Sequence, residues 1–164
     1  WEKDHTLVTA IENSVVWYFQ RLAADVGEAR MQQMLDTLEY GNRDISAGLT
    51  TFWLNASLTI SAEEQVAFLG KLYRDELPVD PAHATIVRDA LVVESGEGWA
   101  YSGKTGTAMI RDGVSHSWFV GHALHDGRQV LFAGWAREDE QIWGRQVRDA
   151  VAAELRHHGW LPEG

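Results

Sequence analysis

Three runs of apolar or alternating residues in the second half of the chain constrain its fold more than any other feature. The runs are "WAYSGKTGT", "SHSWFVGHAL" and "QVLFAGWA", which begin at Trp99, Ser115 and Gln129. The second and third runs are separated by "HDGR", whose Asp126-Gly127 pair is a strong signal for a two-residue hairpin. The pattern therefore predicts an antiparallel meander of three strands.

Helical signals lie on both sides of this meander. Apolar residues recur at helical spacing on either side of Gly27. A capping box starts at Ser61, Asp80-Pro81 is a second start signal, and Gly159 suits the end of the last helix. The helices predicted in this way cover residues 14–26, 31–38, 61–75, 81–90 and 141–158.

Helices that are segregated from an antiparallel sheet define an α+β fold. The 164 residues are enough for one domain with a hydrophobic core. We therefore predict a single domain over residues 1–164. Its first part, 1–92, is mostly helical, and its second part, 93–164, holds the antiparallel strands and a closing helix.

Composition excludes several classes of function. The net charge of −10 repels a phosphate backbone, so nucleic acid is not an expected partner. The longest apolar runs, such as "VVWYF", are too short to span a bilayer, so no membrane segment is expected. The chain has no cysteine, which excludes disulfides, thiolate zinc sites and cysteine nucleophiles.

The stretch "YSGKTGT" places one of the few lysines between glycines. Side chains alternate along a strand, so Ser102, Lys104 and Gly106 are expected on one face. Glycines in a strand mark a bulge or a close approach to the backbone. A cation flanked by bare backbone suits an anionic ligand lying along the strand. The competing interpretation is an ordinary surface lysine in a hairpin arm.

Three further stretches accompany this K-T-G triplet: "SVV" at 14–16, "YGN" at 40–42 and "FWL" at 52–54. In order and spacing the four resemble the penicillin-recognising serine enzymes, most closely the class D, oxacillinase-type β-lactamases. The resemblance runs along nearly the whole chain. It implies that the chain is the C-terminal two-thirds of a β-lactamase/transpeptidase-like fold, without the N-terminal strands and the S-x-x-K helix of that fold. It also implies hydrolysis of β-lactams through an acyl-enzyme, and a periplasmic or other extracytoplasmic location.

The resemblance assigns roles to residues on both parts of the chain. Lys104, with Thr105 and Gly106, would bind the carboxylate of the drug, because a charge-assisted hydrogen bond is about twice as strong as a neutral one. The backbone N–H of Thr107 would donate to the oxyanion. Ser14, helped by Lys104, would relay a proton to the β-lactam nitrogen, so these two are the catalytic candidates. The alternative for Ser14 is a helix N-cap, and both roles are compatible if Asn13 caps instead.

Supporting roles follow from the same resemblance, each with an alternative. Val16 would line the wall of the active site beside the general base of the family. Trp53 would donate its indole N–H to that base; its alternative is simple packing in the core. Tyr40 and Asn42 would lie on the loop opposite the site or serve as turn residues. Arg145 would bind the carboxylate as a second cation or stay solvated.

The nucleophile of the family is missing from the sequence. These enzymes attack with the serine of S-x-x-K, and its lysine carries a CO₂-derived carbamate. The lysines of this chain are Lys3, Lys71 and Lys104, and none follows a serine at that spacing. No cofactor is therefore expected on this chain, and the chain alone is expected to be inactive.

Three explanations for the missing nucleophile stay open: a fragment of a longer enzyme, half of an assembly in which a second chain supplies S-x-x-K, or a degenerate relative. We favour the first, because every later motif is present. The meander would normally pair with upstream strands, and without them it has an unpaired edge that invites association with another chain. A homodimer is plausible from the family.

Two other functions compete with the enzyme. The runner-up is an extracytoplasmic penicillin-binding sensor domain, which acylates quickly and deacylates slowly. The third is a non-catalytic, Trp-rich cell-wall-binding module, although Trp17, Trp53 and Trp118 fall in apolar patterns that predict core positions. No metal site is expected, since the histidines lack ligand spacing, and His116 and His122 are predicted on a solvated strand face.

Overall fold

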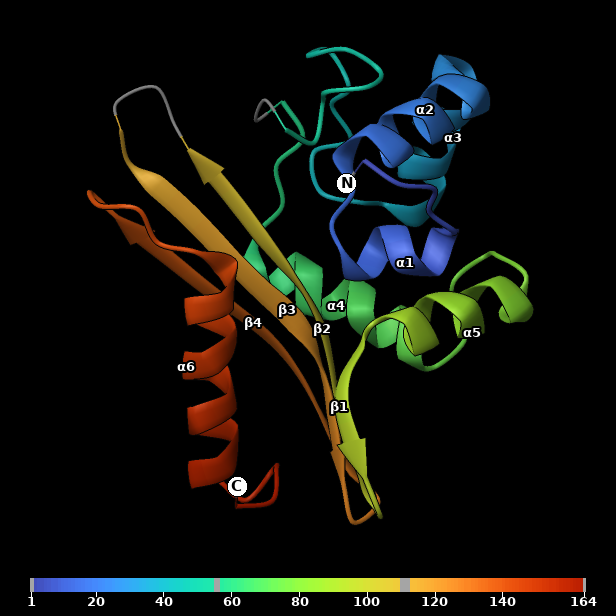
Figure 1. Cartoon of the computed structure of the whole chain (residues 1–164). Helices are drawn as coiled ribbons and strands as arrows, with labels where there is room; N and C mark the ends of the chain where they lie inside the picture. Colours follow the sequence, from blue (N-terminus) through green and yellow to red (C-terminus); the bar gives the residue numbers. More distant parts are fainter. Residues whose placement is uncertain (1, 55–56, 110–112, 164) are drawn as a thin grey trace. The chain divides into compact units, whose positions relative to one another are not determined.

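The computed structural model describes residues 2–54, 57–109 and 113–163. The chain forms two compact units, one made of residues 1–64 and 71–90 and the other of residues 65–70 and 91–164. The helices are α1 (Leu7–Glu12), α2 (Val16–Val26), α3 (Glu28–Leu38), α4 (Ala62–Tyr73), α5 (Pro81–Ala90) and α6 (Gly144–His157). The strands are β1 (Val92–Gly96), β2 (Trp99–Met109), β3 (Ser115–His125) and β4 (Arg128–Glu138) (Figure 1).

The strands form an antiparallel sheet in the order β1-β2-β3-β4. The predicted hairpin joins β3 to β4: Asp126 has φ 50° and Gly127 has φ 74°, the two positive values that a type I′ turn requires. Pairing then runs without interruption from His125↔Arg128 to Ser115↔Glu138. The α+β class, the meander and the closing helix are confirmed.

The meander has one more strand than the sequence analysis predicted. β1 pairs with β2, and its register shifts between Val92 and Glu94. All five of its residues are exposed, and Val92 and Val93 stand side by side rather than alternating with polar residues. The sequence therefore offers neither of the periodic signals by which a strand is recognised.

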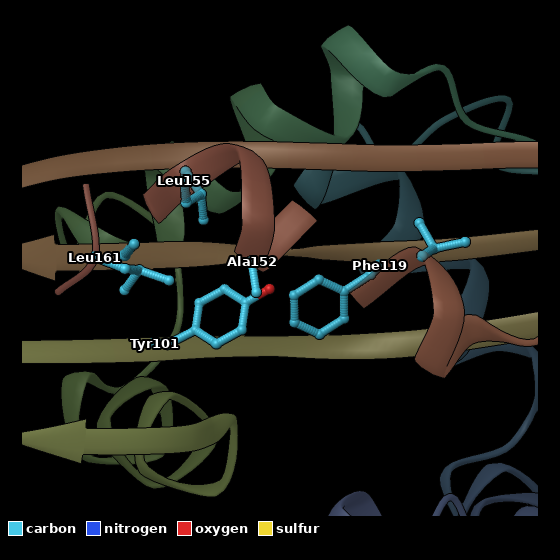
Figure 2. Close-up of a cluster of buried hydrophobic side chains, with 7 residues drawn as sticks. Tyr101, Phe119, Ala152, Leu155 and Leu161 are labelled. Atoms are coloured by element: carbon cyan, nitrogen blue, oxygen red, sulfur yellow. The ribbon is translucent and has the colours of Figure 1, made fainter. Parts of the chain in front are cut away.

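The core of the second unit lies between the sheet and α6. Tyr101, Phe119, Ala152, Leu155 and Leu161 are buried there (Figure 2). The rings of Phe119 and Phe132 stack with centroids 5.4 Å apart, and the Tyr101 ring lies 5.4 Å from that of Phe119. The Tyr101 hydroxyl donates to the carbonyl of Arg148 at 3.0 Å, and burial raises the pKa of that hydroxyl. This contact ties β2 to the middle of α6.

Glycines make room for these rings. Gly103 and Gly121 face each other across β2 and β3. A Cβ on Gly103 would lie 2.5 Å from Cζ of Phe119 and 2.6 Å from the carbonyl oxygen of Val120. A Cβ on Gly121 would overlap the carbonyl oxygen of Ser102. The glycine in "SGK" was interpreted as a sign that another group comes close to the backbone. At Gly103 that group belongs to the hydrophobic core.

The end of α6 has the predicted glycine cap. Gly159 has φ 69°, its N–H donates to Arg156 O at 3.0 Å, and Trp160 N–H donates to Leu155 O at 2.8 Å. This pair of bonds is the Schellman arrangement. It places the Trp160 ring against the guanidinium of Arg128, whose Cζ lies 4.2 Å from the centroid of that ring. The first residue of β4 is thereby tied to the end of α6.

The first unit contains one helix that was not predicted. α1 is only six residues long, and its cap uses Thr6 with Thr9 rather than with glutamate or glutamine. A turn follows, so α2 begins at Val16 and not at residue 14. Gly27, with φ 80°, separates α2 from α3.

Two helix starts in the chain match their sequence signals. Ser61 and Glu64 form the reciprocal bonds of a capping box at the start of α4: Ser61 N–H donates to Glu64 Oε2 at 2.8 Å, and Glu64 N–H to Ser61 Oγ at 3.2 Å. At the start of α5 the Asp80 carboxylate accepts from Ala82 N–H at 2.8 Å. None of the helices in the described ranges combines the length and apolar character needed to cross a membrane.

Candidate functional site

From Lys104 onward, the outer edge of β2 is no longer paired with β1. On this edge Gly103 N–H donates to Leu91 O at 2.8 Å, and the pairing of β1 with β2 ends at Val92↔Ser102. Backbone N–H groups alternate between the two edges of a strand. The N–H groups of Thr105 and Thr107 therefore point to the same edge as that of Gly103, beyond the last β1 pair.

The lysine itself turns toward this edge. Lys104 Nζ donates to the carbonyl oxygen of Thr105 at 3.0 Å, and that carbonyl points the same way as the Thr105 N–H. The side chain is half-buried, and burial lowers the pKa of its amine. A partly dehydrated cation next to backbone N–H groups favours an anionic ligand. Gly106 keeps the adjacent surface open, because a Cβ there would meet only Trp118 Cβ at 3.9 Å.

The two threonines that flank Gly106 face the start of α6. Thr107 Oγ1 accepts from Gly144 N–H at 2.8 Å and from Ser117 Oγ at 3.0 Å. A Cβ on Gly144 would lie 2.8 Å from the Cβ of Thr105. The side chain of Thr107 thus holds α6 against β2 while its backbone N–H points to the outer edge. The hydroxyl-donor role of Thr105 stays a prediction.

Arg145 follows immediately after this anchored residue. It is the second residue of α6, and its guanidinium lies 5.6 Å from the centroid of the Trp143 ring. Its side chain is exposed. The hydrogen bond between Thr107 and Gly144 therefore fixes the position of Arg145 relative to β2, while the role of Arg145 in carboxylate binding stays a prediction.

Two serines support the same junction and were missed in the sequence analysis. Ser115 and Ser117 are fully buried, and both hydroxyls donate to Ile142 O, at 3.0 and 2.8 Å. The alternation in "SHSWF" places both on the face of Phe119, which is the signal that would have found them. Their bonds hold the segment that leads into α6.

Ser14 lies in the turn between α1 and α2, in the other unit. It has φ 51°, a left-handed conformation that is uncommon for serine, and it is exposed. The N-cap interpretation of Ser14 is wrong, because the N-cap of α2 is Val15. Asn13 does not cap α2 either: it ends α1, and its side chain donates to Thr9 O at 2.8 Å. The proton-relay role of Ser14 stays a prediction.

Val16 and Trp53 also lie in the first unit. Val16 is half-buried at the first position of α2, directly after the fully buried Val15. Trp53 contacts Phe52 edge to face, with centroids 4.9 Å apart. It lines a pocket of about 360 Å³ with apolar residues of α2 and α3. The alternative of apolar packing for Trp53 thus has direct support.

One tryptophan that was predicted to be in the core is not there. Trp17 is 40 % exposed, and it lines a surface pocket together with His5 and Arg21 instead. The predicted solvated strand face is also wrong for His122, which is buried and pairs with Gln129 at 3.1 Å. Burial lowers the pKa of the His122 ring. His122 is paired with Ser102 of β2, which is buried as well.

The "YGN" loop is held by its own hydrogen bonds. Asn42 Oδ1 accepts from the N–H groups of Thr59 and Asp44, at 3.0 and 3.2 Å, and its Nδ2 donates to Ser57 O at 2.7 Å. Gly41 has φ 52°, and a Cβ there would overlap the carbonyl oxygen of Thr59. The turn interpretation of Asn42 therefore has direct support, and the backbone at Gly41 requires glycine.

Replacing Asn42 by alanine is expected to lower the free energy of unfolding by about 2 kcal/mol, because three side-chain hydrogen bonds with a net value of about 0.5–1.5 kcal/mol each are lost. Urea unfolding measures this. Asn42→Asp is the comparison: it keeps both acceptor bonds, but it replaces the bond to Ser57 by repulsion between two oxygens. Its loss should be smaller than that of alanine and should shrink further when the carboxyl group is protonated. Equal losses would contradict the assignment of the bonds.

The candidate residues thus fall into two groups. Lys104, Thr105, Gly106, Thr107 and Arg145 come together where β2 meets the start of α6. Ser14, Val16, Tyr40, Asn42 and Trp53 belong to the helical unit. Each group is a coherent local structure, and the approach of Ser14 to Lys104 stays a prediction.

A family model described as the penicillin binding protein transpeptidase domain matches residues 1–157. The probable β-lactamase YbxI of Bacillus subtilis (strain 168) is 49 % identical over 132 residues, which is 80 % of this chain and 49 % of that protein. The chain thus spans about half the length of this curated relative.

Two solved structures are similar along nearly the whole chain. The class D β-lactamase OXA-427 is 35 % identical with a TM-score of 0.87, over 96 % of this chain and 72 % of that one. The C-terminal domain of the BlaR penicillin-receptor of Bacillus licheniformis is 31 % identical with a TM-score of 0.93, over 99 % of this chain and 65 % of that one.

Proposed function

The chain belongs to the penicillin binding protein transpeptidase domain family as a class D β-lactamase-like member, and from this we propose that it forms the substrate-binding part of a serine β-lactamase. The reaction of the whole protein would be hydrolysis of the β-lactam amide through an acyl-enzyme. A segment carrying S-x-x-K would supply the nucleophile, in the same polypeptide or on a second chain. The location would be extracytoplasmic, in the periplasm where the host has one.

The outer edge of β2 is the observation that carries this proposal. It places the Lys104 ammonium and the N–H groups of Thr105 and Thr107 on one edge, where β1 no longer covers the strand. A β-lactam carries a carboxylate beside a strained amide. The cation would hold the carboxylate, and the Thr107 N–H would donate to the oxyanion that forms on the attacked carbonyl. Removing one such donor typically costs about 10²–10³ in rate.

The remaining residues would act around this edge. Arg145, anchored through Gly144 to Thr107, would provide the second cation for the carboxylate. The strained backbone of Ser14 supports a functional role, because left-handed non-glycine residues cluster at functional sites. Ser14 would pass a proton to the departing nitrogen. Val16, Trp53 and the loop at Tyr40 and Asn42 would shape the wall of the site.

A sensor of β-lactams is the second candidate, and one observation favours it. The BlaR receptor domain has a TM-score of 0.93 with this chain, higher than that of the class D enzyme OXA-427. A sensor would use the same binding edge but keep its acyl group. The rate at which the acylated whole protein loses penicillin distinguishes the two: turnover supports the enzyme, and a stable adduct supports the sensor.

The binding role is tested by titrating the ¹⁵N-labelled chain with benzylpenicillin. We expect the amide signals of Thr105, Gly106 and Thr107 to shift, and Lys104→Met to weaken this binding about tenfold or more, because a charged hydrogen bond is lost. Lys71→Met is the control, since Lys71 pairs with Glu39 at 3.2 Å within the helical unit. Equal binding by both variants, or shifts elsewhere only, would contradict the proposal.

A further inference from the structure

A pocket of about 330 Å³ lies between β1 and α6, and its lining includes none of the candidate site residues. Tyr101 and Ala152 line it, and both are buried (Figure 2). Arg148 and Arg156 line it as well, four residues before and four residues after Ala152, so all three lie on one face of the helix. Two long cationic side chains therefore flank a small residue that leaves space between the helix and the sheet.

The guanidinium of Arg156 carries a donor that lacks an acceptor. Its Nε is shielded from solvent and has no hydrogen-bond partner among the residues that the structure describes. The place of Arg156 in the last turn of α6 suits the helix dipole, but the dipole supplies no acceptor for this N–H. A shielded donor on a charged group is costly when it stays unpaired, so this N–H favours a ligand that supplies an acceptor.

The ion pair of Arg148 is easily exchanged for a ligand. Its Nε and Nη2 both donate to one oxygen of the neighbouring residue, Oδ1 of Asp149, at 2.9 and 2.8 Å. The two side chains are 39 % and 66 % exposed, and an exposed ion pair contributes little to stability. A ligand can therefore accept from one side of the Arg148 guanidinium at low cost.

The two arginines act on the same part of the pocket. Burial raises the pKa of the Tyr101 hydroxyl, and the positive charges of Arg148 and Arg156 both oppose that rise. The arginines are two helical turns apart, about 12 Å along the axis, a span that two long side chains can close from opposite sides. The Tyr101 hydroxyl already donates to the Arg148 carbonyl. The donors for a ligand are therefore the two guanidinium groups.

This arrangement favours a tetrahedral oxyanion over a carboxylate. A guanidinium donates two parallel hydrogen bonds, and a carboxylate has only two oxygens, so one arginine is enough to occupy it. A tetrahedral group offers further oxygens to a second arginine. Glu94 is paired with Tyr101 and lines the same pocket, so its carboxylate competes with a bound anion for the two cations.

From these contacts we propose that Arg148 and Arg156 bind a tetrahedral oxyanion, a phosphate-type group, in the pocket between β1 and α6. The group accepts from the shielded Nε of Arg156 and from one side of the Arg148 guanidinium. The pocket has the volume of roughly ten water molecules, so it accommodates either the free ion or an ester that carries the same group. The inference does not depend on β-lactam binding.

Titration of the ¹⁵N-labelled chain with inorganic phosphate tests the site. The Nε–H signal of Arg156 and the amide signal of Ala152 are expected to shift until they saturate, whereas sodium chloride at equal ionic strength leaves them in place. Arg156→Gln is expected to weaken binding about tenfold or more, measured at Ala152, because charged hydrogen bonds are lost. Arg30→Gln is the matched control, an exposed arginine on α3, and keeps the affinity. Shifts that do not saturate, or equal affinities of the two variants, would overturn the proposal.

Glu94→Gln gives a change of opposite sign. Removing the competing carboxylate is expected to tighten phosphate binding about threefold or more and to leave the stability without phosphate unchanged. A clear loss of stability in phosphate-free buffer would show that Glu94 itself is the partner of the arginines, and it would overturn the proposal. Phenyl phosphate, titrated in the same way, distinguishes the two sources of the group: tighter binding than that of inorganic phosphate supports an ester, and weaker binding supports the free ion.

Discussion

Incubation of this chain alone with benzylpenicillin is expected to leave its intact mass unchanged and to hydrolyse the drug no faster than buffer. The lysines are Lys3, Lys71 and Lys104, and the residues three positions before the last two are Phe68 and Tyr101. No lysine can therefore activate a serine from the adjacent turn of a helix. Loss of a catalytic nucleophile lowers kcat by about 10⁶ in a comparable serine hydrolase. Mass spectrometry and loss of β-lactam absorbance measure the two outcomes.

The positive control is the chain joined to a segment that carries S-x-x-K from a class D relative. Acylation is expected to appear in this chimera, and Lys104→Met in the chimera is expected to lower kcat/KM about tenfold or more, because the charged hydrogen bond to the drug's carboxylate is lost. An adduct on the chain alone would show that another residue attacks the drug. A folded chimera that binds no penicillin would contradict the proposed function.

Replacing Gly103 by alanine is expected to lower the free energy of unfolding by about 3 kcal/mol. The new Cβ would lie 2.5 Å from Phe119 Cζ and 2.6 Å from Val120 O, and Phe119 is 1 % exposed. Neither the buried ring nor the backbone carbonyl of the paired strand can move without disturbing the stack over Phe132. Overpacking of a tight core costs about 1–3 kcal/mol, occasionally more. Thermal and urea unfolding measure the loss.

Gly106→Ala is the matched control on the same strand. Its Cβ would meet only Trp118 Cβ at 3.9 Å, an ordinary contact, so the stability should change little. Gly103→Ala combined with Phe119→Leu tests the cause, because the smaller side chain leaves space for the methyl group. The double variant should lose less than the sum of the two single losses. Strict additivity would show that the ring is not the obstacle.

Most of the architecture was predictable because its signals are local. The Asp126-Gly127 turn, the capping box at Ser61 and the glycine cap at Gly159 each lie within a few residues of the structure they specify. The elements that were missed lack such signals. α1 is a six-residue helix, and β1 is exposed along its whole length, so neither shows a period.

The candidate site was predictable as a set of motifs and less so as a set of contacts. Alternation along β2 correctly separated the faces of Lys104 and Thr105. The hydrogen bond from Gly144 to Thr107 joins residues 37 positions apart, and it depends on where α6 begins. The burial of His122 depends on its register with Ser102. Such contacts follow from pairing between elements, which no short stretch of sequence specifies.

The strands of the second unit pair in the order in which they are synthesised. Each strand meets its partner across a short connection, so closing each loop costs little chain entropy. Sheets with such local contacts fold faster than those that must wait for distant segments. The meander is therefore suited to form early, as a scaffold against which α6, the helix that follows it in the sequence, then packs.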